Sequence, residues 1–279
     1  MLLAGVSCDF RLDYGRHIRR SATLLAANRS AREARLNRRP ALAAIGDAGL
    51  CIERLAAALG ERARRAAWLD ELRARDAARE ADIEARAARA GEHVNPVALL
   101  RSLDRVAGEN AVFVADGGDF VATASYILRP RAPLAWLDPG VFGTLGVGAG
   151  FALGAALCRP ESEVWVLYGD GACGYSLMEF DSFVRHGIPL IAVVGNDGGW
   201  TQIAREQVKL LGDDVVTVLA RTAYHEVAAG FGALGILLRS ESEIDPALAR
   251  ARESARNGVP ALVNVWLERN DFREGSISM

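Results

Sequence analysis

The chain has 279 residues, 51% of them hydrophobic, and a formal net charge of −2. This length suffices for one or two domains with a buried core, and the near-neutral charge gives no support for nucleic-acid binding. No run of residues reaches the roughly 18 apolar positions of a membrane span, and the N-terminus lacks the basic and apolar regions of a signal peptide. The 4 cysteines show no paired spacing, which is typical of a reducing compartment. We therefore expect a cytoplasmic protein that binds neither nucleic acid nor a membrane.

The first 94 residues divide into two parts. Residues 2–6 and 23–27 have the composition of short buried strands, and apolar residues at helical spacing follow from Leu50 to Leu59. Residues 61–92 are rich in Ala, Arg and Glu, which predicts an exposed helix. We assign residues 1–60 to a first domain whose opening strand lacks a lead-in, and residues 61–94 to a helical connector.

The remaining residues, 95–279, have the pattern of an α/β domain. Asn95-Pro96 predicts a helix start, with Asn as the cap and Pro in the first turn. Apolar, β-branched runs predict strands at 112–115, 164–168, 188–194, 234–238 and 261–267, with helical patterns between several of them. This order predicts a parallel sheet with helices on both faces.

Two loops at the carboxyl ends of predicted strands carry the clearest chemical pattern. The first is Gly169-Asp-Gly-Ala-Cys-Gly-Tyr175, and the second is Gly195-Asn-Asp-Gly-Gly-Trp200. The glycines allow the backbone to approach a bulky anion. A carboxylate at Asp170 would repel a phosphate unless a divalent cation lay between them, and Mg²⁺ commonly shares such oxygen ligands. The loops are therefore interpreted as a diphosphate–Mg²⁺ site, and the alternative is two plain loops of an α/β domain.

Gly-Asp-Gly followed some two dozen residues later by an Asn-Asn variant resembles the diphosphate motif of the thiamine-diphosphate (ThDP) enzymes. The resemblance implies ThDP and Mg²⁺ as cofactors, with Asp170, Asp197 and the carbonyl of Gly199 as metal ligands. Asp197 stands where the family has Asn, which keeps an oxygen ligand but adds a negative charge. If the register is shifted by one residue, Asn196 is the ligand instead.

The same resemblance implies further cofactor contacts in three loops. Gly118 and Asp119, after the strand 112–115, match positions that hold the diphosphate, although an Asp is unusual there and a plain turn is the alternative. In the glycine-rich stretch 139–150, Leu145 matches the apolar residue under the cofactor and the carbonyl of Gly143 matches an acceptor for its amino group; the alternative is a loop that serves helix packing. The remaining implied contacts are Gly169, Asp170, Gly171, Ala172, Cys173, Asn196, Asp197, Gly199 and Trp200. For Cys173 the alternative is a small residue that packs there, and for Trp200 it is packing rather than a substrate lid.

Within the family, the chain is most similar to the 2-hydroxyacyl-CoA lyases, and acetolactate synthases are second. The similarity extends to Phe180-Asp-Ser-Phe-Val-Arg-His186, Trp200-Thr-Gln-Ile203 and Asn270-Asp-Phe-Arg-Glu-Gly-Ser276. It implies that residues 1–60 are the end of a Rossmann-like middle domain and that residues 95–279 are the ThDP diphosphate-binding domain.

The family places its catalytic glutamate on a separate pyrimidine-binding domain, so no catalytic residue is identifiable in this chain. The resemblance implies an acyl-CoA or 2-oxo acid as the small-molecule substrate. It also implies a homo-oligomer or pairing with a chain that carries the pyrimidine domain. Three hypotheses remain open: an inactive C-terminal part of a lyase, one subunit of a split enzyme, or a non-catalytic module that retains the cofactor loops.

Overall fold

The computed structural model describes residues 1–60 and 65–274. The chain divides into two compact units, Met1–Ala74 and a second one that begins at Arg75, and each is described by itself. The boundary lies within the long helix α2 (Ala66–Ala87), inside the range expected to connect two domains. The domain limits at residues 60 and 94 remain a prediction.

The first unit is a small parallel sheet with one flanking helix. Its strands are β1 (Leu2–Ala4), β2 (Leu25–Asn28) and β3 (Leu42–Ile45), in the order β1-β2-β3. Helix α1 (Ala48–Leu59) begins at Asp47, whose side chain accepts a hydrogen bond from the Leu50 N–H. No residue of α1 is buried, and the unit also contains the short 3-10 helices Phe10–Gly15 and Glu33–Arg35 and the start of α2. Strands β1 and β2 and helix α1 were expected, whereas β3 was missed.

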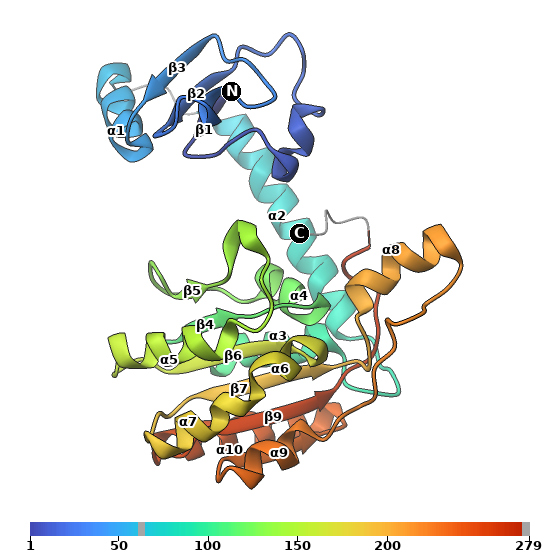
Figure 1. Cartoon of the computed structure of the whole chain (residues 1–279). Helices are drawn as coiled ribbons and strands as arrows, with labels where there is room; N and C mark the ends of the chain where they lie inside the picture. The colour runs from blue at the N-terminus through green and yellow to red at the C-terminus, as the bar shows by residue number, and fades with distance from the viewer. Residues whose placement is uncertain (61–64, 275–279) are drawn as a thin grey trace. The chain divides into compact units, whose positions relative to one another are not determined.

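The second unit contains a six-stranded, fully parallel sheet in the order β5-β4-β6-β7-β9-β8. The strands are β4 (Val112–Ala115), β5 (Trp136–Leu137), β6 (Val164–Gly169), β7 (Ile191–Asn196), β8 (Leu234–Leu238) and β9 (Ala261–Trp266). The central strands are buried on both faces because helices cover both, which explains their continuous apolar runs. Figure 1 shows helices on both faces of this sheet, and the expected fold class is confirmed.

Most helices of this unit belong to one of two separate cores, whereas α8 (Thr201–Leu211) contributes no buried residue to either. Side chains of α3, α4 and α10 pack on one face of the sheet, and those of α5, α6, α7 and α9 pack on the other. Alternation along β6 supplies both cores, since Trp165 and Leu167 point to the first and Tyr168 to the second. The helices are α3 (Pro96–Val106), α4 (Asp119–Ile127), α5 (Gly148–Cys158), α6 (Asp170–Ser176), α7 (Phe180–Arg185), α8 (Thr201–Leu211), α9 (Tyr224–Gly230) and α10 (Ile244–Arg256), with short 3-10 helices at Gly140–Phe142, Leu177–Glu179 and Glu241–Glu243.

The strand order reverses between β4 and β6. The chain leaves β4 through α4 toward the edge strand β5, and it leaves β6 through α6 and α7 toward β7, on the other side. Helix α4 lies on one face of the sheet and α6 on the opposite face. Such a switch point opens a crevice at the carboxyl ends of the strands, where open α/β sheets bind ligands.

The predicted helix start at Asn95-Pro96 is confirmed, since the Asn95 side chain accepts hydrogen bonds from the N–H groups of Val97 and Ala98. The five strands predicted beyond residue 110 are present, whereas β5 and helices α4 and α8 were not foreseen. Within residues 1–60 and 65–274, no helix combines the length and apolarity that crossing a bilayer requires.

Candidate functional site

At the switch point the ends of β4 and β6 touch through glycine backbones. The Gly169 N–H donates to the Gly117 carbonyl over 2.8 Å. A Cβ on Gly118 would lie 3.1 Å from the Gly169 Cα, and Gly118 has a φ of +109°, which side-chain-bearing residues rarely adopt. The two loops therefore meet without side chains between them, and backbone groups form the floor of the crevice.

The buried carboxylate of Asp116 binds the glycine-rich stretch 139–150 beside these glycine backbones. Asp116 accepts hydrogen bonds from the N–H of Gly146 to Oδ1 (2.8 Å) and from the N–H of Gly148 to Oδ2 (2.6 Å). Burial raises the pKa of Asp116, while these two N–H groups oppose the shift. Leu145, held by this loop, lies over Gly117, where a Cβ would come within 2.1 Å of its Cδ2.

Leu145 therefore projects over the crevice, and it keeps 36% of its surface exposed. Gly143, two residues earlier, is exposed and has a φ of +57°. The loop thus presents one apolar side chain and one free stretch of backbone beside the crevice.

A second buried carboxylate, Asp170, joins the ends of β6 and β7. Its Oδ2 accepts hydrogen bonds from the N–H groups of Gly198 (2.9 Å) and Gly199 (3.0 Å), and its Oδ1 accepts from the N–H of Gly171. Only 2% of Asp170 is exposed. Burial, reinforced by the neighbouring charge of Asp197, raises the pKa of Asp170 from 3.8 to about 6. The carboxyl groups of Asp170 and Asp197 therefore lie near each other in a poorly solvated site, which favours the binding of a proton or a cation there.

Asp197 is half-buried at the end of β7. Burial raises its pKa, and the nearby carboxylate of Asp119 adds to this effect, whereas Arg269 and Arg221 oppose it. Acidic side chains thus gather at the carboxyl ends of β4, β6 and β7.

In the loop at 195–200, one backbone carbonyl differs from its neighbours in its hydrogen bonds. The carbonyls of residues 196, 197 and 198 all accept hydrogen bonds from arginine side chains. In the described ranges, none of the hydrogen bonds found ends on the Gly199 carbonyl. Gly199 therefore presents an available oxygen next to the two carboxylates.

Asn196, the alternative ligand, uses its side-chain nitrogen elsewhere. Its Nδ2 donates to the carbonyl of Thr222 and to Oδ1 of Asn264, each over 3.2 Å. Its Oδ1 is buried and has no partner among the residues that the structure describes. The amide belongs to a polar network between β7 and β9, which also includes His225 through Asn264.

The rest of the expected contacts lie on or behind α6. Trp200 packs on the start of this helix, where a Cβ on Gly171 would come within 2.4 Å of its ring. Ala172 and Cys173 are buried, and Cys173 belongs to the core under the helix. Burial raises the pKa of the Cys173 thiol far above its usual range. The Cys173 side chain thus packs inside the domain, and only backbone groups of these two residues can face the loop.

Comparison with known proteins decides the family. The model of the family "Thiamine pyrophosphate enzyme, C-terminal TPP binding domain" matches residues 116–265, which is more than half of the chain and includes the loops described above. The chain belongs to this family. Its second unit carries the family's C-terminal domain, and thiamine pyrophosphate is another name for ThDP.

The relatives point to a branch of the ThDP family. The chain is 49% identical over 286 residues to human "2-hydroxyacyl-CoA lyase 2" and 43% identical over 292 residues to the protein of that name from Caenorhabditis elegans; each match covers 100% of this chain and 45% of the relative. It is 36% identical over 271 residues to "Acetolactate synthase large subunit IlvG" of Mycobacterium tuberculosis, covering 95% of this chain and 48% of the relative. The chain thus spans a little under half the length of these relatives.

A solved structure supports the ThDP-enzyme fold. The "thiamine diphosphate-dependent 4-hydroxybenzoylformate decarboxylase" of Rhodococcus jostii RHA1 aligns with a TM-score of 0.74, at 19% identity, over 97% of this chain and 49% of that one. At this identity the likeness concerns the fold alone.

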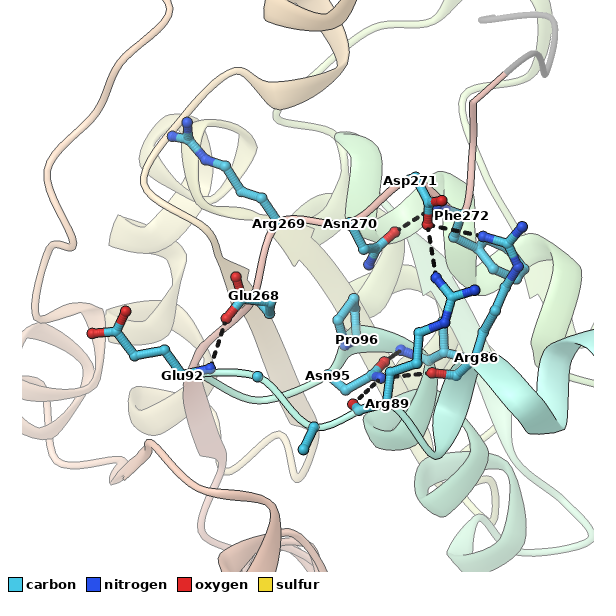
Figure 2. A pocket seen from close by; sticks show the side chains of 13 residues that line it. Arg86, Arg89, Glu92, Asn95, Pro96, Glu268, Arg269, Asn270, Asp271 and Phe272 are labelled. Atoms are coloured by element: carbon cyan, nitrogen blue, oxygen red, sulfur yellow. Dashed lines mark hydrogen bonds and ion pairs between the residues drawn. The ribbon is translucent and has the colours of Figure 1, made fainter.

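A pocket of about 410 Å³ lies apart from the expected site residues. Several of its polar groups are paired with one another, as Figure 2 shows: Arg86 lies 2.9 Å from Asp271, and the backbone N–H of Glu92 donates to Glu268. The pocket therefore marks the junction between the start of this unit and its last described segment. Its lining residues are Arg86, Arg89, Ala90, Gly91, Glu92, Asn95, Pro96, Val97, Glu268, Arg269, Asn270, Asp271 and Phe272.

Sequence reasoning missed five residues that organise the site: Asp116, Arg205, Arg221, Tyr224 and Arg269. Asp116 lies directly after the predicted strand 112–115, but its bonds to residues 30 and 32 positions away leave no local signal. Tyr224 donates its hydroxyl to the Asp170 carbonyl over 2.8 Å from a separate helix. Such contacts depend on tertiary structure, and no spacing rule would have found them.

Proposed function

We propose that this chain supplies the ThDP- and Mg²⁺-binding part of a carbon–carbon lyase of the 2-hydroxyacyl-CoA lyase type. One observation carries the proposal: Asp170, Asp197 and the Gly199 carbonyl, which has no partner among the described residues, lie together beside the glycine contact between β4 and β6. That place is where an open α/β sheet binds a ligand, and the relatives named 2-hydroxyacyl-CoA lyase 2 match the whole chain.

The donor set fits a magnesium ion shared with a diphosphate. Mg²⁺ prefers hard oxygen ligands and is commonly held by one or two carboxylates plus phosphate oxygens. Within the described ranges, no three His, Cys, Asp or Glu side chains form a metal cluster. The metal would therefore bind to Asp170, Asp197 and the Gly199 carbonyl, with the diphosphate completing its coordination. Asn196 remains the alternative ligand, since its Nδ2 is bound to Thr222 and Asn264 and its Oδ1 has no partner among the described residues.

The backbone floor fits the diphosphate. Gly118 and Gly169 leave room for close approach because neither carries a side chain. The two ring systems of the cofactor would lie against Leu145, and the carbonyl of Gly143 would accept a hydrogen bond from the amino group. When bound, ThDP supplies the carbanion chemistry that cleaves the bond next to a carbonyl. The chain's own residues bind the cofactor, orient it and keep water from it.

The substrate in this proposal is a 2-hydroxyacyl-CoA, which would be cleaved to an aldehyde and formyl-CoA. The identity to an acetolactate synthase, 36%, supports a 2-oxo acid as the alternative. The chain matches only 45% of the human relative, and we propose that activity needs a pyrimidine-binding domain that residues 1–279 do not include. On that account it is inactive alone and works in an oligomer, in the cytoplasm. A non-catalytic ThDP-binding module remains the second candidate.

A complementation assay tests this function. The chain is mixed with the part of human 2-hydroxyacyl-CoA lyase 2 that it does not match, together with ThDP and Mg²⁺, and supplied with a 2-hydroxyacyl-CoA or with pyruvate. We expect aldehyde and formyl-CoA from the first substrate, and neither component should be active alone. Acetolactate from pyruvate would favour the alternative reaction, and a ThDP-loaded mixture without either activity would favour the non-catalytic module.

A further inference from the structure

Two arginines hold the backbone of the loop that follows β7. Arg221 donates from Nη1 to the Asn196 carbonyl over 2.5 Å and from Nη2 to the Leu267 carbonyl over 3.0 Å. Arg269 donates from Nε to the Asp197 carbonyl over 3.2 Å and from Nη2 to the Gly198 carbonyl over 2.9 Å. Three consecutive carbonyls of one loop are thus bound by charged donors.

The two arginines come from different parts of the chain. Arg221 lies between α8 and α9, and Arg269 follows β9. Arg269 starts at the edge of the pocket in Figure 2, and its side chain extends away from Asp271. The guanidinium packs against the loop itself, since a Cβ on Gly199 would lie 2.7 Å from its Nη2. A glycine at 199 is therefore required for this contact.

The hydrogen bonds to this loop involve some of its carbonyls and not others. The carbonyls of residues 196–198 are bound, whereas the carbonyl of Gly199 is not, within the part of the chain that the structure describes. The N–H groups of Gly198 and Gly199 are fixed from the other side by Asp170. The loop is therefore clamped by arginines on its carbonyls and by a carboxylate on its amides.

We propose that Arg221 and Arg269 are positioning residues that hold the 196–199 loop so that the Gly199 carbonyl and the Asp197 carboxylate face a divalent cation. This inference rests on the proposed function. Metal sites depend on groups that orient the ligands as well as on the ligands themselves, and removing such a group commonly weakens metal binding about 10- to 100-fold. Neither arginine touches the cation in this account.

Arg239 provides a matched control, because its guanidinium lies over the same Trp266 ring as that of Arg221. Arg221 and Arg239 both lie over the face of Trp266, at 5.6 Å and 4.3 Å from its centroid. The contacts found for the Arg239 side chain do not include the 196–199 loop. Arg239→Gln therefore removes an arginine from the Trp266 ring and leaves the loop carbonyls bound.

Two readouts on the full chain test the inference. The first is hydrogen exchange of the Gly198 and Gly199 amides without metal, and the second is the dissociation constant for Mn²⁺ in the presence of ThDP. In Arg269→Gln we expect both amides to exchange at least about tenfold faster and Mn²⁺ to bind at least about tenfold more weakly. Arg239→Gln should change neither, and Arg269→Lys, which keeps one positively charged nitrogen in place of the two that donate from Arg269, should fall between Arg269→Gln and the wild type.

The two readouts separate this inference from the proposed function. If the wild-type chain does not bind Mn²⁺ even after a pyrimidine-domain fragment is added, the proposed function fails for this chain, and amide exchange still decides whether the arginines hold the loop. Wild-type exchange rates in both Arg269→Gln and Arg221→Gln would overturn the inference. It would also be overturned if Arg239→Gln weakened Mn²⁺ binding as much as Arg269→Gln.

Discussion

Arg205 and Asp119 form an ion pair in which Nη2 and Oδ2 are 2.7 Å apart, and both side chains are largely buried. The pair joins α8 to the first residue of α4, at the edge of the candidate site. An Asp at position 119 was unexpected from the sequence, because its carboxylate would be repelled by a phosphate bound beside it. The guanidinium of Arg205 balances that charge.

The first prediction concerns this pair. Arg205→Met should lower the free energy of unfolding by about 3 kcal/mol, because the largely buried carboxylate of Asp119 then loses the guanidinium that is paired with it. Adding Asp119→Asn should recover part of the loss. Urea unfolding measures both effects. The exposed pair Arg185–Asp181 is the control, and Arg185→Met should cost less than about 1 kcal/mol. Equal losses for Arg205→Met and Arg185→Met would show that the buried pair has no special role.

The second prediction concerns the contact between the glycine backbones. Gly118→Ala combines a φ of +109° with a Cβ only 3.1 Å from the Gly169 Cα, so it should destabilise the fold by about 2 kcal/mol or more. Gly150→Ala is the control, since its Cβ meets nothing within 4 Å and it lies in helix α5. It should be neutral or stabilise the fold by up to about 1 kcal/mol. Thermal unfolding measures the stability of both variants. A Gly118→Ala chain as stable as the Gly150→Ala chain would contradict the close approach of Gly118 to Gly169.

The sequence predicted the sheet because its strands are apolar on both faces and are bounded by glycine loops. Asn95-Pro96 and the loop at 195–200 were placed correctly for the same local reasons, whereas the expected loop at 169–175 was wrong, because residues 170–176 already form helix α6 directly after β6. Strand β5 has two residues, too few for a periodic pattern. Helix α8 is amphipathic, but this pattern was overlooked, and none of its residues is buried.

The contacts that hold the loops were beyond sequence reasoning because they join distant residues. Asp116 binds amides some 30 positions away, and Arg269 binds carbonyls 71 and 72 positions away. Carboxylates and arginines in loops are usually solvated, so the pattern gave no reason to single these out. Cys173 shows the opposite case, since the alternative of a small packing residue agrees with its place in the core.

The third prediction concerns Asp116. Asp116→Ala should leave the N–H groups of Gly146 and Gly148 without their acceptor, at a cost of about 2 to 4 kcal/mol for two buried donors. It should also release Leu145 from its place over Gly117. Hydrogen exchange of the 143–148 segment should accelerate more than that of β6, because β6 keeps its backbone hydrogen bonds to the neighbouring strands. Unchanged exchange in that segment would contradict the role given to Asp116.

The fourth prediction is a pH dependence in the metal-free chain. The pKa of Asp170 is raised from 3.8 to about 6, so the folded state holds this proton more tightly than the unfolded state. The resulting stabilisation is complete below pH 3.8 and is lost as the pH rises through 6, in total about 3 kcal/mol. Relative to Asp170→Asn, the wild-type chain should therefore lose stability between pH 4 and pH 7, as urea unfolding would measure. Parallel pH profiles for the two chains would contradict the raised pKa.

The most direct test of the account is calorimetric titration of the full chain with ThDP, with and without Mg²⁺, beside Asp170→Ala and the exposed control Asp181→Ala. The account predicts Mg²⁺-dependent binding to the wild type and to Asp181→Ala, and at least about tenfold weaker binding to Asp170→Ala. If the folded wild type shows no binding, a pyrimidine-domain fragment is added and the titration is repeated. Binding that is equal in Asp170→Ala and the wild type, or absent even with that fragment, would contradict the claim that these loops form a diphosphate–Mg²⁺ site.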